Sequence, residues 1–198
     1  MSAIEARQTP YPVDPLILQR WSPRAFDRSA IPQADLLTLF DAARWAPSAF
    51  NAQPWRFLYA QRGSENWPRF LKLLLPFNAA WAEHAAALVF VLSDTLIQPS
   101  DTVDQAVSRS HSFDAGAAWA LLALQATRLG YYTHGMTGAD FERARIELAV
   151  PARFHFEAAV AIGRQGAASE LPDTLRAREH PSQRKPIEEL AFEGRFPA

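Results

Sequence analysis

The sequence predicts a mixed fold, either α/β or α+β, in which helices flank one β-sheet. Two observations lead to this class. Segments with apolar residues at helical spacing make up most of the chain, and short aromatic and aliphatic runs, typical of strands, alternate with them. The 198 residues suffice for a substantial core, so we expect residues 1–198 to form a single domain.

The predicted helices begin or end at residues that suit helix termini. Asp14 and Pro15 suit the cap and the first position of the first helix. Gly130 ends a long Ala/Leu-rich helix, and Asp140 caps the next one. In chain order the predicted helices are 15–19, 32 to before Pro47, 66–75 with a break at Pro76, 81–84, 112–129 and 140–148, with an apolar element at 187–192.

The predicted strands are short and bounded by turn residues. An aromatic segment between Pro54 and Gly63 predicts a strand at 55–61. Residues 86–94 are apolar on both faces, which predicts a buried strand, and the polar stretch after it, to about Ser108, predicts a mobile loop. The remaining strands are 131–138, which runs into a glycine-containing turn, and 154–163.

The composition argues against several classes of protein. With 20 basic and 21 acidic side chains the formal net charge is -1, whereas nucleic-acid-binding proteins usually carry a basic excess. The absence of cysteine excludes disulfides and thiolate metal sites. The longest apolar run is too short to span a bilayer, and the first residues lack the apolar core of a signal peptide. We therefore expect a cytoplasmic protein whose partners include neither nucleic acid nor membrane.

Motifs of common nucleotide, zinc and hydrolase sites are absent. The chain contains no G-x-G-x-x-G, P-loop, H-E-x-x-H or G-x-S-x-G pattern. His155 and Glu157 would share one face of a strand, and a polar strand face explains them better than a metal site does. We predict no metal site and no catalytic side chain.

Two basic stretches are candidates for anion binding. Arg20, Ser22 and Arg24 alternate on a chain that Pro23 keeps extended, so all three can face one ligand. Guanidinium groups suit phosphate oxygens. A second basic pair lies near the C-terminus, at Arg184 and Lys185. Taken singly, each stretch is also explained by a solvated basic segment.

Two other stretches could contact a flat ligand. Ser48 and Asn51 follow Pro47 in a loop whose amides could bind the edge of a heteroaromatic ring, or could only satisfy the loop backbone. The glycines of the segment 135–138 would allow the backbone to approach a flat ring closely, although an ordinary tight turn is the alternative.

Together these stretches resemble the nitroreductase family of FMN-dependent oxidoreductases. The segment AARWAPSAFNAQPWRF resembles the family's P-S-x-x-N-x-Q-P-W block, and RWSPRAF resembles its R-x-S-x-R/K-x-F block. DAGAAWALLALQATRLGYYTHGMTG resembles its long central helix and following glycine turn, and RKPIEEL its closing basic motif. The order and spacing of the four motifs agree over nearly the whole chain.

This resemblance implies a fold, an assembly and a reaction. The fold would be α+β, a three-layer α/β/α arrangement with a central, mostly antiparallel sheet. The assembly would be a domain-swapped-type homodimer with FMN at the interface. NAD(P)H would give a hydride to FMN, and a nitroaromatic, quinone or activated-alkene acceptor would then take it by a ping-pong mechanism through the same pocket.

The resemblance also implies the residues that contact FMN. Arg20 and Ser22 match the phosphate or ribityl side, and Arg24 matches a cation that faces the flavin pyrimidine and would stabilise charge at N1. Residues that would reach the FMN of the partner subunit are Pro47, Ser48 and Asn51. The other matches are Met136, Thr137 and Gly138 beside the ring, Asn78 near the ring, and Arg184 and Lys185 at the phosphate.

The resemblance defines the acceptor pocket and the exact reaction less closely than it defines the FMN site. Candidate pocket residues are Phe77, Trp81, His111 and Phe113, for each of which core packing is the alternative. Other reactions on the same scaffold are those of a dehalogenase, a flavin-destroying oxygenase or a dehydrogenase. A non-catalytic FMN-binding protein and a scaffold that has lost its flavin are further alternatives.

Overall fold

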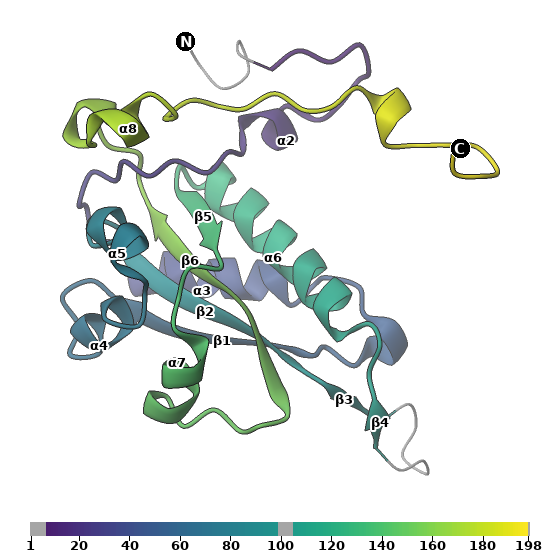
Figure 1. Cartoon of the computed structure of the whole chain (residues 1–198), viewed down its shortest axis with the longest axis horizontal. Helices are drawn as coiled ribbons and strands as arrows, with labels where there is room; N and C mark the ends of the chain where they lie inside the picture. The colour runs from purple at the N-terminus through teal and green to yellow at the C-terminus, as the bar shows by residue number, and fades with distance from the viewer. Residues whose placement is uncertain (1–6, 99–104, 198) are drawn as a thin grey trace.

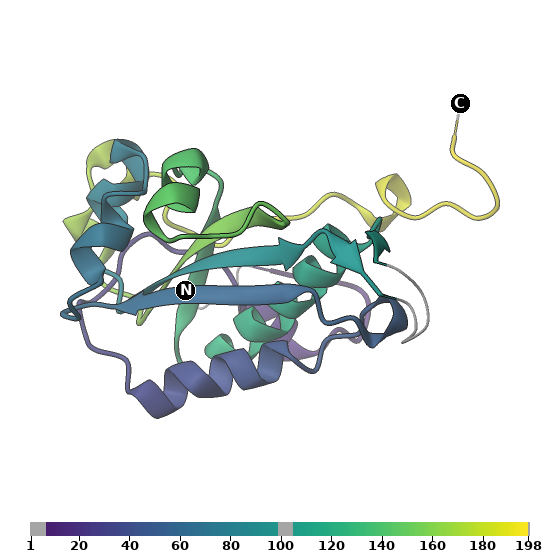
Figure 2. The same cartoon turned by 90° about the horizontal axis from the view of Figure 1, so that it is seen from below.

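The computed structural model describes residues 7–98 and 105–197 and shows a four-stranded antiparallel sheet with helices on both faces (Figures 1 and 2). The strand order is β1-β2-β6-β5. The strands are β1 (Trp55–Gln61), β2 (Ala87–Asp94), β5 (Tyr132–Met136) and β6 (Phe154–Gly163). The predicted α+β class and the three-layer arrangement with an antiparallel sheet are confirmed.

The two faces of the sheet form two separate cores. Figure 2 shows α3 (Gln33–Ala43) and α6 (His111–Arg128) beneath the sheet, where their apolar residues pack against Val89, Val91 and Val160. The opposite face is covered by α4 (Trp67–Leu71), α5 (Pro76–Ala82) and α7 (Phe141–Glu147). Because β2 lies between both cores, its residues are buried on both sides, as the sequence predicts.

The predicted helix caps are present. Asp14 accepts a hydrogen bond from the Leu16 amide at 2.7 Å at the start of α2 (Pro15–Gln19). Asp140 accepts one from the Arg143 amide at 3.0 Å at the start of α7. Gly130, with φ of 78°, follows α6 in the left-handed conformation that glycine adopts at little cost.

Several predicted elements differ from the structure, and three of these differences matter for the fold. The helix expected at 66–75 ends at Leu71, and Pro76 begins α5 instead of only breaking a helix, because proline suits the first helical position. The loop expected up to Ser108 contains a small hairpin of β3 (Leu96–Ile97) and β4 (Ala106–Val107), while its residues 99–104 lie outside the described part of the chain. The polar tail contains a further short helix, α8 (Asp173–Arg176).

The remaining ordered pieces are short 3₁₀ turns and a C-terminal segment. The turns are Ala49–Asn51, Ala168–Glu170 and Ile187–Glu189. The C-terminal segment passes beside the N-terminal one (Figure 1), and the Arg7 guanidinium donates from Nε to the Ser182 carbonyl at 3.1 Å. No helix in the described residues is long and apolar enough to cross a membrane.

Candidate functional site

A strongly cationic cavity of about 380 Å³ lies where the N-terminal and C-terminal segments meet. Five arginines and two histidines line it, and no acidic residue belongs to this lining: Arg7, Arg20, Arg24, Arg178, Arg184, His134 and His180, together with Trp21, Ser22 and Ser182. The predicted group Arg20, Ser22 and Arg24 is therefore brought together, and Arg184 joins it from the other end of the chain.

Three of these arginines crowd one another. The Arg7 guanidinium donates from Nη1 to the Arg20 carbonyl at 2.6 Å, which fixes the N-terminal segment against the cavity. Burial lowers the pKa of Arg20, and the nearby Arg184 lowers it further. Burial, Arg184 and Arg20 lower the pKa of Arg7 in the same way. Like charges held this close favour an anionic ligand, because it would relieve their repulsion.

Arg24 and His134 form the inner wall of the cavity. Burial lowers the pKa of Arg24, and Arg178 lowers it further, while Glu179 raises it. Its Nε is buried and has no hydrogen-bond partner in the described part of the chain. The His134 ring lies with Nδ1 2.9 Å from the Pro23 carbonyl, and burial lowers the pKa of His134, so the neutral imidazole donates to that carbonyl.

Two open pockets extend from this cavity along β5 and α6. One, of about 500 Å³, is lined by Arg20 and Ser22 and by residues of α6. The other, of about 550 Å³, is lined by Phe77, Asn78, His134–Gly138, Trp119 and Ala158. Trp119 and Gly135 line both pockets, so the cationic cavity and the end of β5 form one continuous surface.

The turn after β5 is held by Asn78. The Asn78 amide donates from Nδ2 to the Gly138 carbonyl at 3.0 Å, and the Leu75 amide donates to the same oxygen at 3.0 Å. A Cβ at position 138 would lie 2.3 Å from Asn78 Nδ2, so only glycine fits without moving that side chain. Asn78 thus fixes the segment that carries Met136, Thr137 and Gly138.

The loop around Ser48 lies apart from these pockets. The Ala49 amide donates to Asp114 Oδ2 at 3.2 Å, in the first turn of α6, and the Gln53 amide donates to Ser48 Oγ at 3.0 Å. The pockets described above begin at Trp119, five residues further along α6 and thus more than one turn away. Pro47, Ser48 and Asn51 line none of these pockets.

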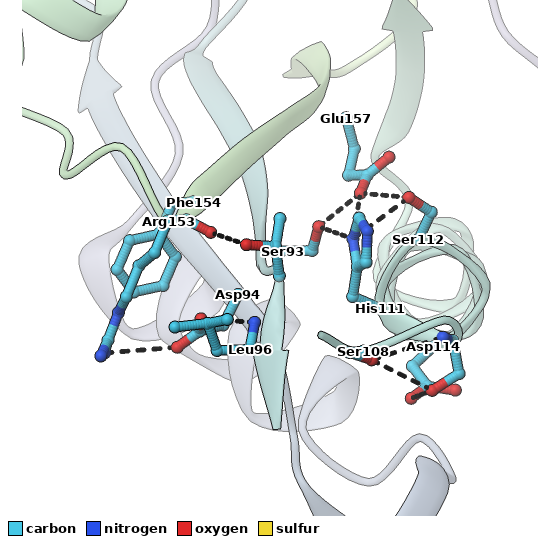
Figure 3. A network of polar contacts seen from close by, with 12 residues as sticks. Ser93, Asp94, Leu96, Ser108, His111, Ser112, Asp114, Arg153, Phe154 and Glu157 are labelled. Carbon is cyan, nitrogen blue, oxygen red and sulfur yellow. Dashed lines mark hydrogen bonds and ion pairs between the residues drawn. The ribbon is translucent and has the colours of Figure 1, made fainter. Parts of the chain in front are cut away.

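A polar network joins the first turn of α6 to the sheet (Figure 3). Ser93 Oγ donates to Glu157 Oε1 at 2.5 Å and lies 2.7 Å from His111 Nδ1, and Ser112 Oγ donates to Glu157 at 2.8 Å. Between β2 and β6 the register shifts at Val91/Leu92, so that Glu157 is the extra residue of a bulge. Within the described residues no group of three or more His, Asp or Glu side chains could hold a metal ion.

Comparisons with known proteins agree with this arrangement. Residues 17–90 match the sequence profile of the nitroreductase family. A solved structure described as an oxidoreductase containing FMN is 53% identical, covers 96% of this chain and 96% of its own, and superposes with a TM-score of 0.93. This chain belongs to the nitroreductase family.

More distant relatives of this nitroreductase-family chain cover most of its length. A Thermus thermophilus protein described as an NADH dehydrogenase is 28% identical over 204 residues, which cover 88% of this chain and 92% of the relative. A Desulfovibrio desulfuricans structure described as a nitroreductase in complex with FMN is 26% identical and covers 96% of this chain and 100% of its own, with a TM-score of 0.71.

Two further predicted site residues line none of the pockets described above. Trp81 is only 1% exposed and packs in the core against Phe26 and His134, in line with the core-packing alternative given for it. Lys185 does not line the cationic cavity; its ammonium lies 3.6 Å from the Glu189 carboxylate on the surface. The position of Trp81 depends on its packing against residues distant in the sequence, and that of Lys185 on the path of the C-terminal segment.

The other candidates for the acceptor pocket fall into two groups in this nitroreductase-family chain. Phe77 is 61% exposed and lines the pocket at the end of β5. His111 and the 82% exposed Phe113 lie in the first turn of α6, near the Ser48 loop and away from Phe77.

Several residues at the site carry no local sequence signal that would have revealed them. Arg7 and Arg178 line the cavity but belong to no motif, and Glu179 accepts hydrogen bonds from the backbone of Arg24. His134 directly precedes the glycine segment 135–138, and that position in the sequence was the one available signal for it. Asp114, which accepts a hydrogen bond from the Ser48 loop, could have been noticed as an acidic residue in an otherwise Ala/Leu-rich helix.

Proposed function

We propose that this chain is an FMN-dependent oxidoreductase. It takes a hydride from NAD(P)H and passes it to a nitroaromatic, quinone or activated-alkene acceptor by a ping-pong mechanism. The observation that carries this proposal is the continuity of the five-arginine cavity with the open pockets along β5. A ligand with an anionic tail and a flat ring suits such a surface, because guanidinium groups bind phosphate and a glycine segment admits a ring at close range.

The residues of the cavity fit the phosphate of FMN. Arg184 lies close enough to lower the pKa of both Arg7 and Arg20, and a phosphate dianion between the three guanidinium groups would offset this repulsion. Ser22, whose Oγ lies 3.3 Å from Arg20 Nη1, adds a neutral donor to the same side. We assign these four residues to the phosphate and the ribityl chain.

The residues along β5 fit the flavin ring. Arg24, with its buried and unpartnered Nε, would face the polar edge of the ring, and the segment Met136–Gly138 would lie alongside it. When bound, FMN supplies the hydride chemistry, and the side chains orient it and set its electrostatics. The Arg24 charge favours negative charge on the polar edge of the ring. The exposed Phe77 would contact the acceptor.

A second copy of the chain is part of this proposal. Pro47, Ser48 and Asn51 line none of the pockets described above, yet their loop exposes large aromatic side chains, with Trp45 71% and Phe50 74% exposed. Large exposed apolar groups usually mark an interaction surface. We propose that Pro47, Ser48 and Asn51 reach the FMN of the partner subunit.

The sheet edge and the C-terminal segment support the same dimer. β1 lies at the edge of the sheet and borders a groove of about 240 Å³ with a mainly apolar lining, near Leu148 and Phe154. Unpaired strand edges readily accept a further chain segment. Residues 182–197 of the C-terminal segment are all exposed and carry the paired rings of Phe192 and Phe196, so we propose that they pack on the partner in a domain-swapped homodimer.

The relatives support the cofactor and the donor. The 53% identical structure is described as containing FMN, and the Thermus thermophilus relative as an NADH dehydrogenase. An Exiguobacterium sibiricum structure described as a nitroreductase in complex with FMN has a TM-score of 0.73. The single-domain organisation and the cytoplasmic location expected from the sequence stay predictions.

An absorption spectrum of the purified protein, followed by anaerobic titration, tests this function. We expect a flavin spectrum that NADH or NADPH bleaches and that a nitroaromatic or quinone restores. Bound FMN that neither nucleotide reduces would contradict the reductase and favour a non-catalytic flavin-binding protein. Reduction without reoxidation by any of the three acceptor classes would contradict the proposed acceptors and point to a specialised reaction on this scaffold.

A further inference from the structure

Glu179, in the C-terminal segment just after α8, holds the backbone of the basic N-terminal stretch. Its Oε1 accepts hydrogen bonds from the Arg24 amide at 2.7 Å and from the Ala25 amide at 2.8 Å. These hydrogen bonds join residues 155 and 154 positions apart in the chain. The position of Arg24 at the cavity therefore depends on a side chain from the other end of the protein.

The same carboxylate is also a charge next to an arginine that has no ionic partner. Glu179 Oε2 is buried without a hydrogen-bond partner in the described residues, as is Arg24 Nε. No ion pair within 4 Å involves either residue in that part of the chain. Because Glu179 nonetheless raises the pKa of Arg24, the two charges interact without forming a closed pair, and the guanidinium stays available to a ligand.

No acidic side chain lines the cavity itself, so Glu179 is placed to offset part of its positive charge from behind Arg24. A cation beside a bound flavin favours the more negative, reduced form and raises the reduction potential, whereas a nearby carboxylate opposes this effect. The cavity alone would thus favour the reduced cofactor strongly, and Glu179 would moderate that preference.

We propose that Glu179 is a positioning residue with two effects on bound FMN. Its hydrogen bonds fix the backbone of Arg24, and its negative charge keeps the flavin reduction potential lower than the surrounding arginines alone would set it. This inference rests on the proposed function, since it assigns FMN to the cavity.

Two substitutions separate the two effects. Glu179→Gln removes the charge but keeps a side-chain oxygen that can accept both backbone amides. We expect it to retain FMN with an affinity within about threefold of the wild type. At a fixed potential the ratio of reduced to oxidised flavin should rise about tenfold, which corresponds to about 30 mV for a two-electron couple. Glu179→Ala removes the hydrogen bonds as well, and its FMN affinity should fall about tenfold.

The potential is measured by chemical reduction against a reference dye, so that the result does not depend on turnover. Glu170→Gln is the matched control, because Glu170 pairs with Arg28 at 2.7 Å and does not line the cavity; its potential should stay at the wild-type value. A Glu179→Gln protein with FMN bound at an unchanged potential would overturn the inference and leave the proposed function intact. Wild-type protein unable to bind FMN would overturn both.

Discussion

Replacing Arg20 by alanine tests the assignment of the cationic cavity, because it should separate ligand binding from folding stability. Burial and Arg184 both lower the pKa of Arg20, which means that the charged form of Arg20 is destabilised in the ligand-free protein. The hydrogen bond from its guanidinium to Ser22 Oγ is long, at 3.3 Å. We therefore expect Arg20→Ala to cost the apoprotein little, while the FMN phosphate would be left with one cationic partner fewer.

The magnitude follows from the strength of a charge-assisted hydrogen bond. A hydrogen bond to a charged group contributes about 1.5–3 kcal/mol, and about 1.4 kcal/mol corresponds to a tenfold change in affinity. The FMN dissociation constant should therefore rise about 10- to 100-fold. The free energy of unfolding of the apoprotein should change by no more than about 0.5 kcal/mol, or roughly 2 °C in Tm for a chain of this size.

Fluorescence titration of apoprotein with FMN measures the affinity, and thermal unfolding of the same sample without FMN measures the stability. Arg143→Ala is the matched control, since Arg143 pairs with Glu147 on α7 and does not line the cavity. The reasoning fails if Arg20→Ala unfolds the apoprotein at a clearly lower temperature while FMN binds as tightly as before. That result would make Arg20 a structural residue.

Four other substitutions have defined outcomes. Burial lowers the pKa of His134 in the folded protein, whereas in the unfolded chain this histidine is protonated below about pH 6.5. The free energy of unfolding of the wild type should therefore fall as the pH drops below about 6.5. Urea unfolding at pH 5.5 and at pH 7.5 should show a smaller decrease in this free energy for His134→Gln than for the wild type. Trp81→Ala should cost about 3–5 kcal/mol in urea unfolding and Phe77→Ala less than about 0.5, since they are 1% and 61% exposed; similar costs would contradict the core placement of Trp81. Tyr131→Phe should lower the free energy of unfolding by about 1 kcal/mol, because it removes the 2.7 Å hydrogen bond to Asp35. Because burial raises the pKa of Tyr131, wild-type stability should fall as the pH rises above about 10, and Tyr131→Phe should abolish this fall.

The elements that the sequence predicts well are those with local causes. The bounds of β1 and β6 agree with the prediction, because proline and glycine delimit short aromatic and aliphatic runs. The caps at Asp14 and Asp140 also follow from residues within one turn of the helix start. The alternation of Arg20 and Arg24 around Pro23 likewise predicts that the two side chains face the same way, and both line the cationic cavity.

Features that depend on distant parts of the chain could not be predicted. Trp81 stands at the start of the predicted helix 81–84, and only its packing on Phe26 and His134 places it in the core. Glu179 reaches Arg24 across 155 positions with no motif to mark it. A single sequence contains no signal for such pairs, so the contact of Glu179 with the Arg24 backbone became visible only in the folded chain.

The Ser48 loop offers a final test, because its backbone is strained without an evident reason within one chain. Phe50 has φ of 54° and ψ of 22°, the left-handed region, and Asn51 and Gln53 also have positive φ. For a non-glycine residue this conformation costs about 1–2 kcal/mol. Phe50 is 74% exposed, so its ring contributes little packing within the chain to offset that cost.

A partner subunit that covers the Phe50 ring would explain why the strain is retained. In an isolated chain Phe50→Gly should be neutral or slightly stabilising, since relief of strain roughly offsets the entropy of glycine in the unfolded state. In the proposed dimer the same change removes a large apolar side chain from the interface, so we expect weaker self-association in sedimentation experiments and faster FMN loss. Arg28→Gly, which relieves a φ of 61° and removes a surface ion pair with Glu170, should change neither. A Phe50→Gly protein that keeps its dimer affinity and its FMN would show that this loop lies outside the subunit interface, and the strain would then need another cause.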